Sequence, residues 1–169
     1  MLEVYFQFRR ASLSEPIGYA QLADSLGTSV GKRIDAARVR EAVLELRRSK
    51  GMVLDASDRD TRSAGSIFTN PIRTDEQARD LPEGAPRFAA GEGLTKSSAA
   101  WLIDHAGFGK GYPGSGPARL SSKHVLALTN HADATASDRV DWAREVRAGV
   151  HERYGIWLEP EPVRVGLGL

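Results

Sequence analysis

The chain has 169 residues, of which 41% are hydrophobic and 27% are charged, and this is enough for one ordinary domain and part of a second. Its 23 Lys and Arg residues nearly balance 22 Asp and Glu residues, so the formal net charge of +1 argues against a nucleic-acid-binding module. The absence of cysteine excludes disulfides, thiolate nucleophiles and cysteine-bound metal sites, which suits a cytoplasmic protein.

The first elements lie in residues 1–50. Residues 2–8 alternate apolar and polar side chains, which is the period of a half-buried strand that needs a sheet partner. Either a later strand pairs with it, or its sheet lies outside this chain. Helical spacing predicts a helix over 17–26, and a clearer helix follows with Asp35 as its cap and an end near Gly51. No run reaches the roughly 18 apolar residues of a membrane span, so we expect no membrane contact.

The middle of the chain alternates irregular segments with one helix. Helical spacing predicts a helix over 95–106, with Thr95 as its cap and Gly107 as its stop. Three segments rich in Gly, Pro, Ser or Asp show no regular period and predict loops: 55–70, 81–93 and 107–117.

The last third contains the longest predicted helix. An apolar strand is expected over 125–128, and the helix then runs over 135–154 with a capping box at its start and Gly155 at its end. Residues 156–165 predict a strand whose middle is made irregular by two prolines. This order of strands and helices indicates an α+β fold, with a mixed α/β arrangement as the alternative.

Motif spacing alone identifies no active site. The Gly-Lys pair at Lys110 lacks the earlier glycine and the following hydroxyl residue of a P-loop, so Lys110 is either a phosphate contact or a solvated lysine. The four histidines show no i, i+4 pair, and we expect no metal site. His124 precedes the apolar strand, where its ring could face a cleft or the surface.

Residues 65–71 read Gly-Ser-Ile-Phe-Thr-Asn-Pro and resemble the Gly-Ser-Phe-Phe-x-Asn-Pro motif of the UDP-N-acetylenolpyruvoylglucosamine reductases, the MurB family. Further similarity follows in the same order along both sequences, and several colinear motifs are more specific than any one of them. The additional matches are the Lys-x-x-Ala-x-Trp-Leu-Ile helix at 96–103, the Lys-Gly pair at 110–111, the segments 126–130 and 134–138, and Leu-Glu-Pro-Glu within 155–161.

The resemblance implies a substrate-binding domain of this reductase type together with a remnant of the flavin-binding domain. It assigns residues 1–50 to the C-terminal remnant of the FAD-binding domain, 51–154 to the substrate-binding domain, and 155–169 to a C-terminal strand that carries the active-site glutamate. It also implies that the strand at 2–8 is one of the last strands of the flavin-binding domain, whose remainder precedes it.

In this family, NADPH reduces FAD, and the flavin passes hydride to the enolpyruvyl ether of UDP-N-acetylglucosamine, which gives UDP-N-acetylmuramate for peptidoglycan of the cell wall. The resemblance implies that Ser66 is the proton donor and that Glu161 is the active-site glutamate. Three positions depart from the family: Phe88 stands where a tyrosine is frequent, His124 where a glutamine is familiar, and Pro117 where a small residue is more usual. The residues that the resemblance places in contact with the substrate are Asn70, Phe88, Lys110 and His124.

Two hypotheses follow. The chain is part of this oxidoreductase, or it is a catalytically silent remnant that binds a UDP-sugar or a protein partner. The family's glycine-rich flavin motif and a catalytic arginine lie upstream of the residues present here. We therefore expect this chain alone to bind no FAD or NADPH tightly, to be inactive, and to expose a strand at 2–8 that can pair with a second copy.

Overall fold

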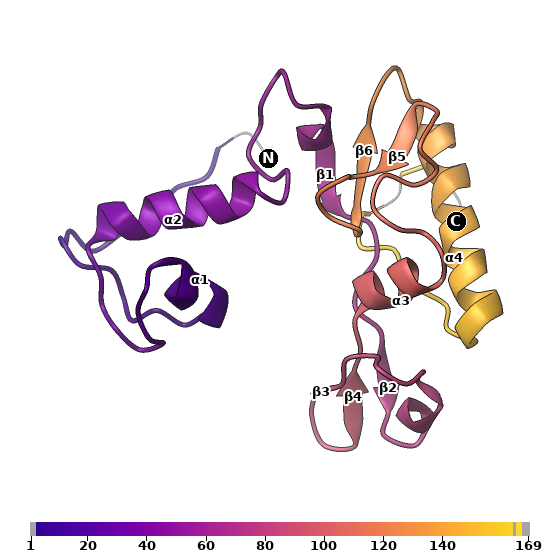
Figure 1. Cartoon of the computed structure of the whole chain (residues 1–169), viewed down its shortest axis with the longest axis horizontal. Coiled ribbons are helices and arrows are strands. Elements are labelled where there is room, and N and C mark those ends of the chain that lie inside the picture. Colours follow the sequence, from indigo (N-terminus) through magenta and orange to yellow (C-terminus); the bar gives the residue numbers. More distant parts are fainter. Residues whose placement is uncertain (1–2, 164, 167–169) are drawn as a thin grey trace. The chain divides into compact units, whose positions relative to one another are not determined.

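The computed structural model describes residues 3–163 and 165–166 (Figure 1). The chain divides into two compact units, unit 1 over residues 1–53 and unit 2 over residues 54–169. The assignment of residues 1–50 to a flavin-binding domain stays a prediction. Among the described residues, no helix is long and apolar enough to cross a membrane.

Unit 1 holds two helices, α1 (Ala20–Ser25) and α2 (Ala36–Arg48). The cap predicted for α2 is confirmed, since the Asp35 carboxylate accepts the N–H of Arg38 at 3.0 Å. Helix α1 begins later than expected because Ile17 forms a loop contact instead, in which its N–H donates to the carbonyl of Lys32 at 2.9 Å. Ile17 is one of only two buried hydrophobic side chains among the described residues of unit 1.

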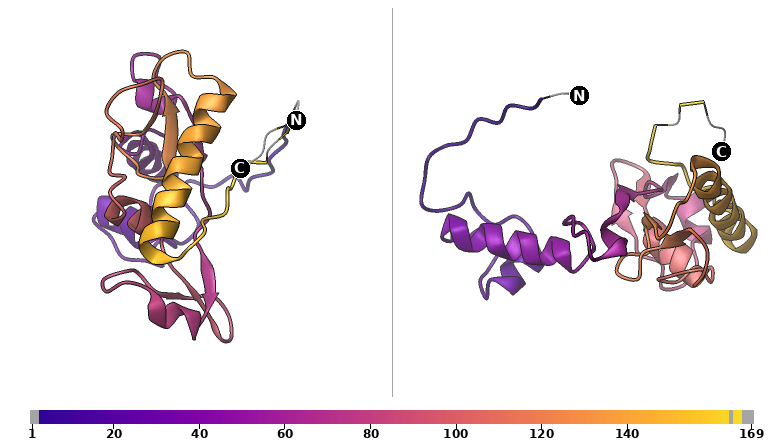
Figure 2. Two further views of the ribbon diagram at one scale, coloured as in Figure 1. Left: turned by 90° about the vertical axis from the view of Figure 1, so that its right-hand side faces the viewer. Right: turned by 90° about the horizontal axis from the view of Figure 1, so that it is seen from above.

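The strand predicted over residues 2–8 is absent from its described part, residues 3–8. These residues have no regular secondary structure and no backbone hydrogen bond to another segment (Figure 2, right). The apolar side chains of the pattern are exposed, with Phe8 at 83%. An amphipathic strand is stable only beside a partner strand, and none of the described residues supplies one. The prediction is therefore wrong for this chain, and Leu2 lies outside the described residues.

Unit 2 contains two small antiparallel sheets, with strand orders β1-β6-β5 and β2-β4-β3. In the first sheet Ser66 lies opposite Ala127, and in the second Arg73 lies opposite Thr95. The α+β class is confirmed, because all strand pairs are antiparallel and the helices lie outside the sheets. The strands are β1 (Ser63–Ser66), β2 (Ile72–Thr74), β3 (Phe88–Ala89), β4 (Leu94–Lys96), β5 (Ala118–Leu120) and β6 (Ala127–Asn130), and the two 3₁₀ helices are η1 (Arg59–Thr61) and η2 (Gln77–Asp80).

Helix α4 (Ala136–Tyr154) packs along the first sheet, while α3 (Ala99–His105) lies between the two sheets (Figures 1 and 2). The predicted capping box of α4 is confirmed: the Thr135 hydroxyl accepts the N–H of Asp138 at 3.2 Å, and the Asp138 carboxylate accepts the N–H of Thr135 at 2.8 Å. One continuous core joins α3, α4 and the first sheet. Its fully buried members include Phe68, Leu102, Ile103, Leu120, Val146, Val150 and Leu158.

Several predicted boundaries are wrong because the strands are short. Thr95 does not cap a helix but lies in β4, and α3 is capped by Ser98, whose hydroxyl accepts the N–H of Trp101 at 3.2 Å. The predicted loops 55–70 and 81–93 contain β1 and β3, which are too short to show a period of two. The strand expected over 125–128 begins only at Ala127.

In residues 156–163 and 165, the described part of the strand predicted over 156–165, only one isolated β-bridge forms, between Phe68 and Pro160; Arg164 lies outside the described residues. Pro160 and Pro162 lack the backbone N–H that a longer ladder would need. The structure therefore corrects the expected C-terminal strand to an irregular segment. The bridge still ties this segment to the residues that follow β1.

Candidate active site

Ser66 closes strand β1 at a bend in the backbone. The pairing of β1 with β6 shifts register between Ser63 and Ser66, as in a β-bulge. Gly65 has a φ of +97°, which side-chain-bearing residues rarely adopt, so the bend depends on glycine here. The Ser66 side chain is half-buried and lines a cavity of about 240 Å³.

The cavity lies between β1, the N-terminal half of α4 and the C-terminal segment. Most of its walls are apolar, as at Ile67 and Val140, and the charged residues among its described lining are Arg62 and Arg139. Two positive charges beside apolar walls favour an anionic ligand with an apolar portion. Neither arginine stands out in the sequence, because the two residues come together only through the packing of α4 on the sheet.

Glu161 reaches the same region through its backbone. Its N–H donates to the carbonyl of Ile67 at 2.9 Å, while the N–H of Ile67 donates to the carbonyl of Leu126 at 3.0 Å. Ile67 thus connects the C-terminal segment, through Glu161, to the residue that precedes β6, Leu126. The prolines flanking Glu161 line the cavity together with Ser66. The structure therefore brings the Ser66 and Glu161 segments together, with the Glu161 side chain exposed.

Asn70 supports helix α3. Its side-chain oxygen accepts the N–H of Ala99 at 2.9 Å, so it complements the Ser98 cap at the start of this helix. The sequence did not indicate this structural bond. Because the bond uses the side-chain oxygen, the amide NH₂ group is the part of Asn70 suited to contact a ligand.

His124 lies in the turn before β6 and is half-buried. Its Nδ1 accepts the N–H of Leu126 at 3.1 Å, and its own backbone N–H donates to the hydroxyl of Ser121 at 3.2 Å. An accepting Nδ1 carries no proton, so in this arrangement the proton of the neutral ring is on Nε2. Since Leu126 also bonds Ile67, His124 is connected through the backbone to the residue after Ser66.

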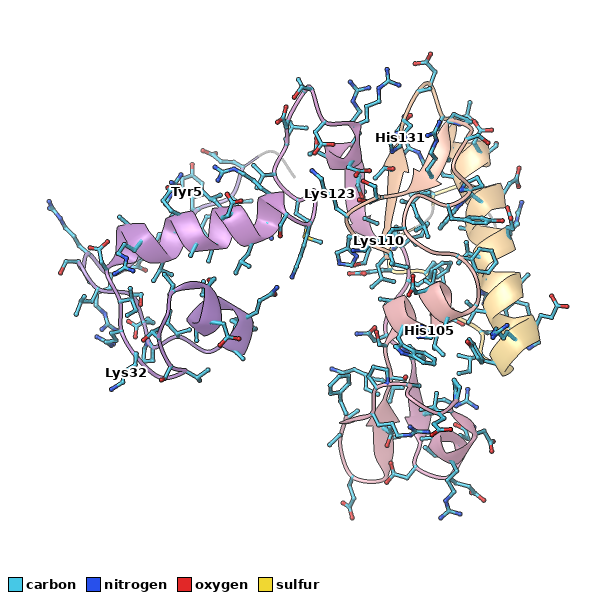
Figure 3. The ribbon with its side chains drawn as sticks, in the orientation of Figure 1. Tyr5, Lys32, His105, Lys110, Lys123 and His131 are labelled. Carbon is cyan, nitrogen blue, oxygen red and sulfur yellow. The ribbon has the colours of Figure 1, made fainter. Side chains whose placement is uncertain are left out.

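Phe88 and Lys110 do not line the cavity beside Ser66. Phe88 lies in β3 opposite Lys96 and is 54% exposed. Lys110 is exposed in the loop that follows α3 (Figure 3). Their predicted substrate contacts stay predictions, and any ligand that touches them must extend beyond the cavity.

A polar cluster at the entry to β1 has no counterpart among the sequence predictions. Asp60, only 5% exposed, accepts the N–H of Ser122 at 3.2 Å, and Nε2 of His131 lies 3.4 Å from its carboxylate. A hydrogen bond from the Lys123 ammonium to Asp58 lowers the pKa of this carboxyl and raises the pKa of Lys123 (Figure 3). The cluster links η1 to the turn before β6. Its members are too far apart in the sequence to be paired by spacing.

Among the described residues, no group of three or more His, Asp or Glu side chains is arranged to hold a metal ion.

Comparison with known proteins agrees with the motif similarity. The family model described as the C-terminal domain of UDP-N-acetylenolpyruvoylglucosamine reductase matches residues 56–165. The protein named UDP-N-acetylenolpyruvoylglucosamine reductase in Streptomyces coelicolor is 53% identical to this chain, and the match covers 100% of this chain and 47% of the relative. The protein of the same name in Thermobifida fusca is 54% identical, and the match covers 99% of this chain and 49% of the relative. The chain thus spans about half the length of the curated relatives it matches.

A crystal structure of the reductase from Thermus caldophilus is also similar to this chain. The two sequences are 24% identical and the TM-score is 0.41. The match covers 78% of this chain and 37% of the Thermus caldophilus chain.

Proposed function

The chain belongs to the UDP-N-acetylenolpyruvoylglucosamine reductase family, and we propose that it forms the substrate-binding part of such a reductase. The reaction is the NADPH- and FAD-dependent reduction of the enolpyruvyl ether of UDP-N-acetylglucosamine to UDP-N-acetylmuramate, a cytoplasmic step of peptidoglycan precursor synthesis. The observation that carries this proposal is the meeting of the Ser66 and Glu161 segments at one cavity.

Ser66 is proposed to protonate the substrate. Hydride addition to one carbon of the enol ether leaves carbanion character on the other carbon, and the Ser66 hydroxyl supplies the proton that this carbon needs. A hydroxyl is a weak acid, so it serves only toward a much stronger base and only when it is prepositioned. The bend at Gly65 and the two backbone bonds of Ile67 support such prepositioning. Arg62 and Arg139 favour the anionic substrate at the same cavity.

Glu161 is proposed to act beside the carboxyl end of the substrate. Two carboxylates repel, so Glu161 is either protonated there or contacts the substrate through a water molecule. The side chains of His124 and Asn70 are proposed to contact the substrate as well. Lys110 and Phe88, which lie away from the cavity, are assigned to the diphosphate and to another part of an extended substrate.

Side-chain caps compete with a flavin diphosphate at the starts of the three longer helices, α2, α3 and α4. A flavin diphosphate needs free backbone N–H groups, which helix N-termini commonly supply. At each of the starts of α2, α3 and α4 one such group is already bonded to a side chain, that of Asp35, Ser98 or Thr135. We therefore assign FAD, which supplies the hydride after reduction by NADPH, to the portion of the relatives that this chain does not cover, and expect no tight flavin binding by this chain alone.

A chimera tests the proposed function. In it, this chain replaces the matching region of the Streptomyces coelicolor reductase, to which it is 53% identical. The expected result is a flavin-loaded protein that oxidises NADPH when the enolpyruvyl substrate is added. A folded, flavin-loaded chimera that binds this substrate but does not turn it over would overturn the reductase proposal and support the silent UDP-sugar-binding remnant.

A further inference from the structure

Arg147 of α4 contacts three consecutive residues of the C-terminal segment. Its Nε donates to the carbonyl of Leu158 at 2.8 Å, and an Nη lies 3.4 Å from the carboxylate of Glu159. Its guanidinium carbon lies 4.8 Å from the centroid of the Trp157 ring. The Arg147 side chain is 22% exposed and its bond to the Leu158 carbonyl is partly buried, whereas Glu159 lies at the surface with a side chain that is 70% exposed. One side chain thus holds the whole of residues 157–159, here called the anchor segment.

Two further contacts hold the anchor segment, one with a second side chain of α4 and one with the core of unit 2. His151, one turn after Arg147 on α4, stacks on Trp157 with ring centroids 4.0 Å apart and planes inclined by 19°. Leu158 is fully buried in the core of unit 2. The anchor segment is therefore attached to α4 by a polar contact, by an aromatic contact and by apolar burial.

Glu161 follows the anchor segment with few attachments of its own. The carbonyl of Glu159 accepts the N–H of Thr69 at 2.9 Å, and the N–H of Glu161 donates to the carbonyl of Ile67. The Thr69 hydroxyl also donates to the Glu159 carbonyl at 3.3 Å, while Pro160, between the two glutamates, has no N–H to donate. The position of the Glu161 backbone at Ile67 therefore depends on where the anchor segment leaves α4.

We propose that Arg147 is a positioning residue for Glu161. By fixing the anchor segment on α4, it aligns the short stretch that bonds to Ile67 and so holds Glu161 next to the Ser66 cavity. The contact requires arginine, because a planar guanidinium can meet a carbonyl, a carboxylate and an aromatic face together, whereas lysine offers a single charged group. The functional consequence rests on the proposed role of Glu161 in substrate binding, while the alignment itself does not.

The first test uses the complete 169-residue chain. Amide hydrogen exchange followed by NMR reports how firmly the stretch from Glu159 to Glu161 is held against Ile67 and Thr69. Arg147→Met keeps an unbranched apolar stem but removes the donors, and it should speed exchange at the Glu161 and Thr69 amides about tenfold. Arg147→Lys should speed exchange at these two amides about as much as Arg147→Met does. The Ile67 amide, which bonds Leu126 on the other side, should be unchanged. All three amides should also be unchanged in Arg153→Met, a variant of the same helix whose guanidinium contacts Tyr154. An unaltered Glu161 amide in Arg147→Met overturns the proposal.

The second test separates positioning from general loosening of the fold. It compares two ligands by calorimetry, the enolpyruvyl substrate and UDP-N-acetylglucosamine, which lacks the enolpyruvyl group. Arg147→Met should weaken binding of the first about fivefold and leave the second unchanged, and the loss should vanish in a Glu161→Gln background. Equal losses for both ligands contradict positioning. If the unmodified chain binds neither ligand, the proposed function fails, and the exchange measurement still decides the alignment by Arg147.

Discussion

Unit 1 and unit 2 differ in what their amphipathic elements pack against. In the described part of unit 1 only Ile17 and Ala23 are buried hydrophobic residues, and α2 has no buried residue despite its well-formed cap. In unit 2 a continuous core joins α3, α4 and the first sheet. The contrast teaches that local signals suffice to form a helix end, whereas stability and an ordered site require a core. We expect unit 2 to carry both the folding free energy and the chemistry of this chain.

The largest expected difference between the units concerns catalysis. In the chimera, Ser66→Ala should slow product formation roughly a thousandfold while leaving flavin reduction by NADPH nearly intact, because proton donation belongs to the second half-reaction. Stopped-flow absorbance of the flavin separates the two. Ser25→Ala in unit 1 is the matched control, since that hydroxyl only donates to the carbonyl of Leu22 on its own helix. Equal impairment of both half-reactions by Ser66→Ala would contradict its role.

A core substitution tests where the folding free energy lies. Leu102 of α3 is fully buried, and Leu102→Ala should lower the free energy of unfolding by about 3 kcal/mol. Leu13→Ala in unit 1, where the side chain is 50% exposed, should cost less than about 1 kcal/mol. Urea unfolding followed by circular dichroism measures both. Similar losses for the two variants would show that unit 1 holds more of the folding free energy than its burial indicates.

Two glutamates of the C-terminal segment of unit 2, Glu161 and Glu159, are expected to differ in their effect on turnover. Glu161→Gln should lower turnover of the chimera about a hundredfold, because the proposed role of Glu161 needs a carboxyl group beside the substrate. Glu159→Gln should lower it less than about threefold, since its contact with Arg147 is solvent-exposed and such ion pairs contribute little. Steady-state NADPH oxidation gives both values. Indistinguishable effects would remove the assignment of Glu161.

The smallest expected effect concerns acid pH at the start of α4. A hydrogen bond from the Thr135 hydroxyl, followed by that from its backbone N–H, lowers the pKa of Asp138. A carboxyl whose pKa is lowered by folding stabilises the fold above its unfolded pKa of about 4, and this contribution is lost as pH falls through the folded pKa. The helicity of α4, measured by NMR, should therefore decrease by a small amount when the pH is lowered below about 4. Asp138→Asn should flatten this dependence, and an unchanged profile would show that the capping box adds nothing to it.

Helix ends were predictable because their signals are local. Asp35, Thr135 and Gly155 act on groups within a few residues, so their roles follow from the sequence. The strands were harder to predict, because β1 pairs with β6 from a distant part of the chain and each strand has only two to four residues. The expected strand at 2–8 had the right period but no partner, and period alone cannot supply one.

The candidate site divides in a similar way. Motif similarity led to the proposed roles of Ser66 and Glu161, and the structure adds the backbone bond through Ile67 that joins their segments. Spacing could not reveal Arg62 and Arg139 at the cavity, nor the contacts of Arg147 with the anchor segment, because each depends on how α4 packs. Tertiary packing, rather than the local pattern, thus decides which charged side chains of α4 face the site.

The two prolines beside Glu161 also affect how unit 2 meets other polypeptides. Strand β1 lies at one end of its sheet, and the edge beyond it is where a foreign strand would add. Just past β1 that edge is occupied by residues 159–161, and Pro160 and Pro162 offer no N–H to a newcomer. Intermolecular β-aggregation is therefore discouraged at this edge of unit 2, whereas pairing of the exposed residues 3–8 of unit 1 with a second copy stays a prediction.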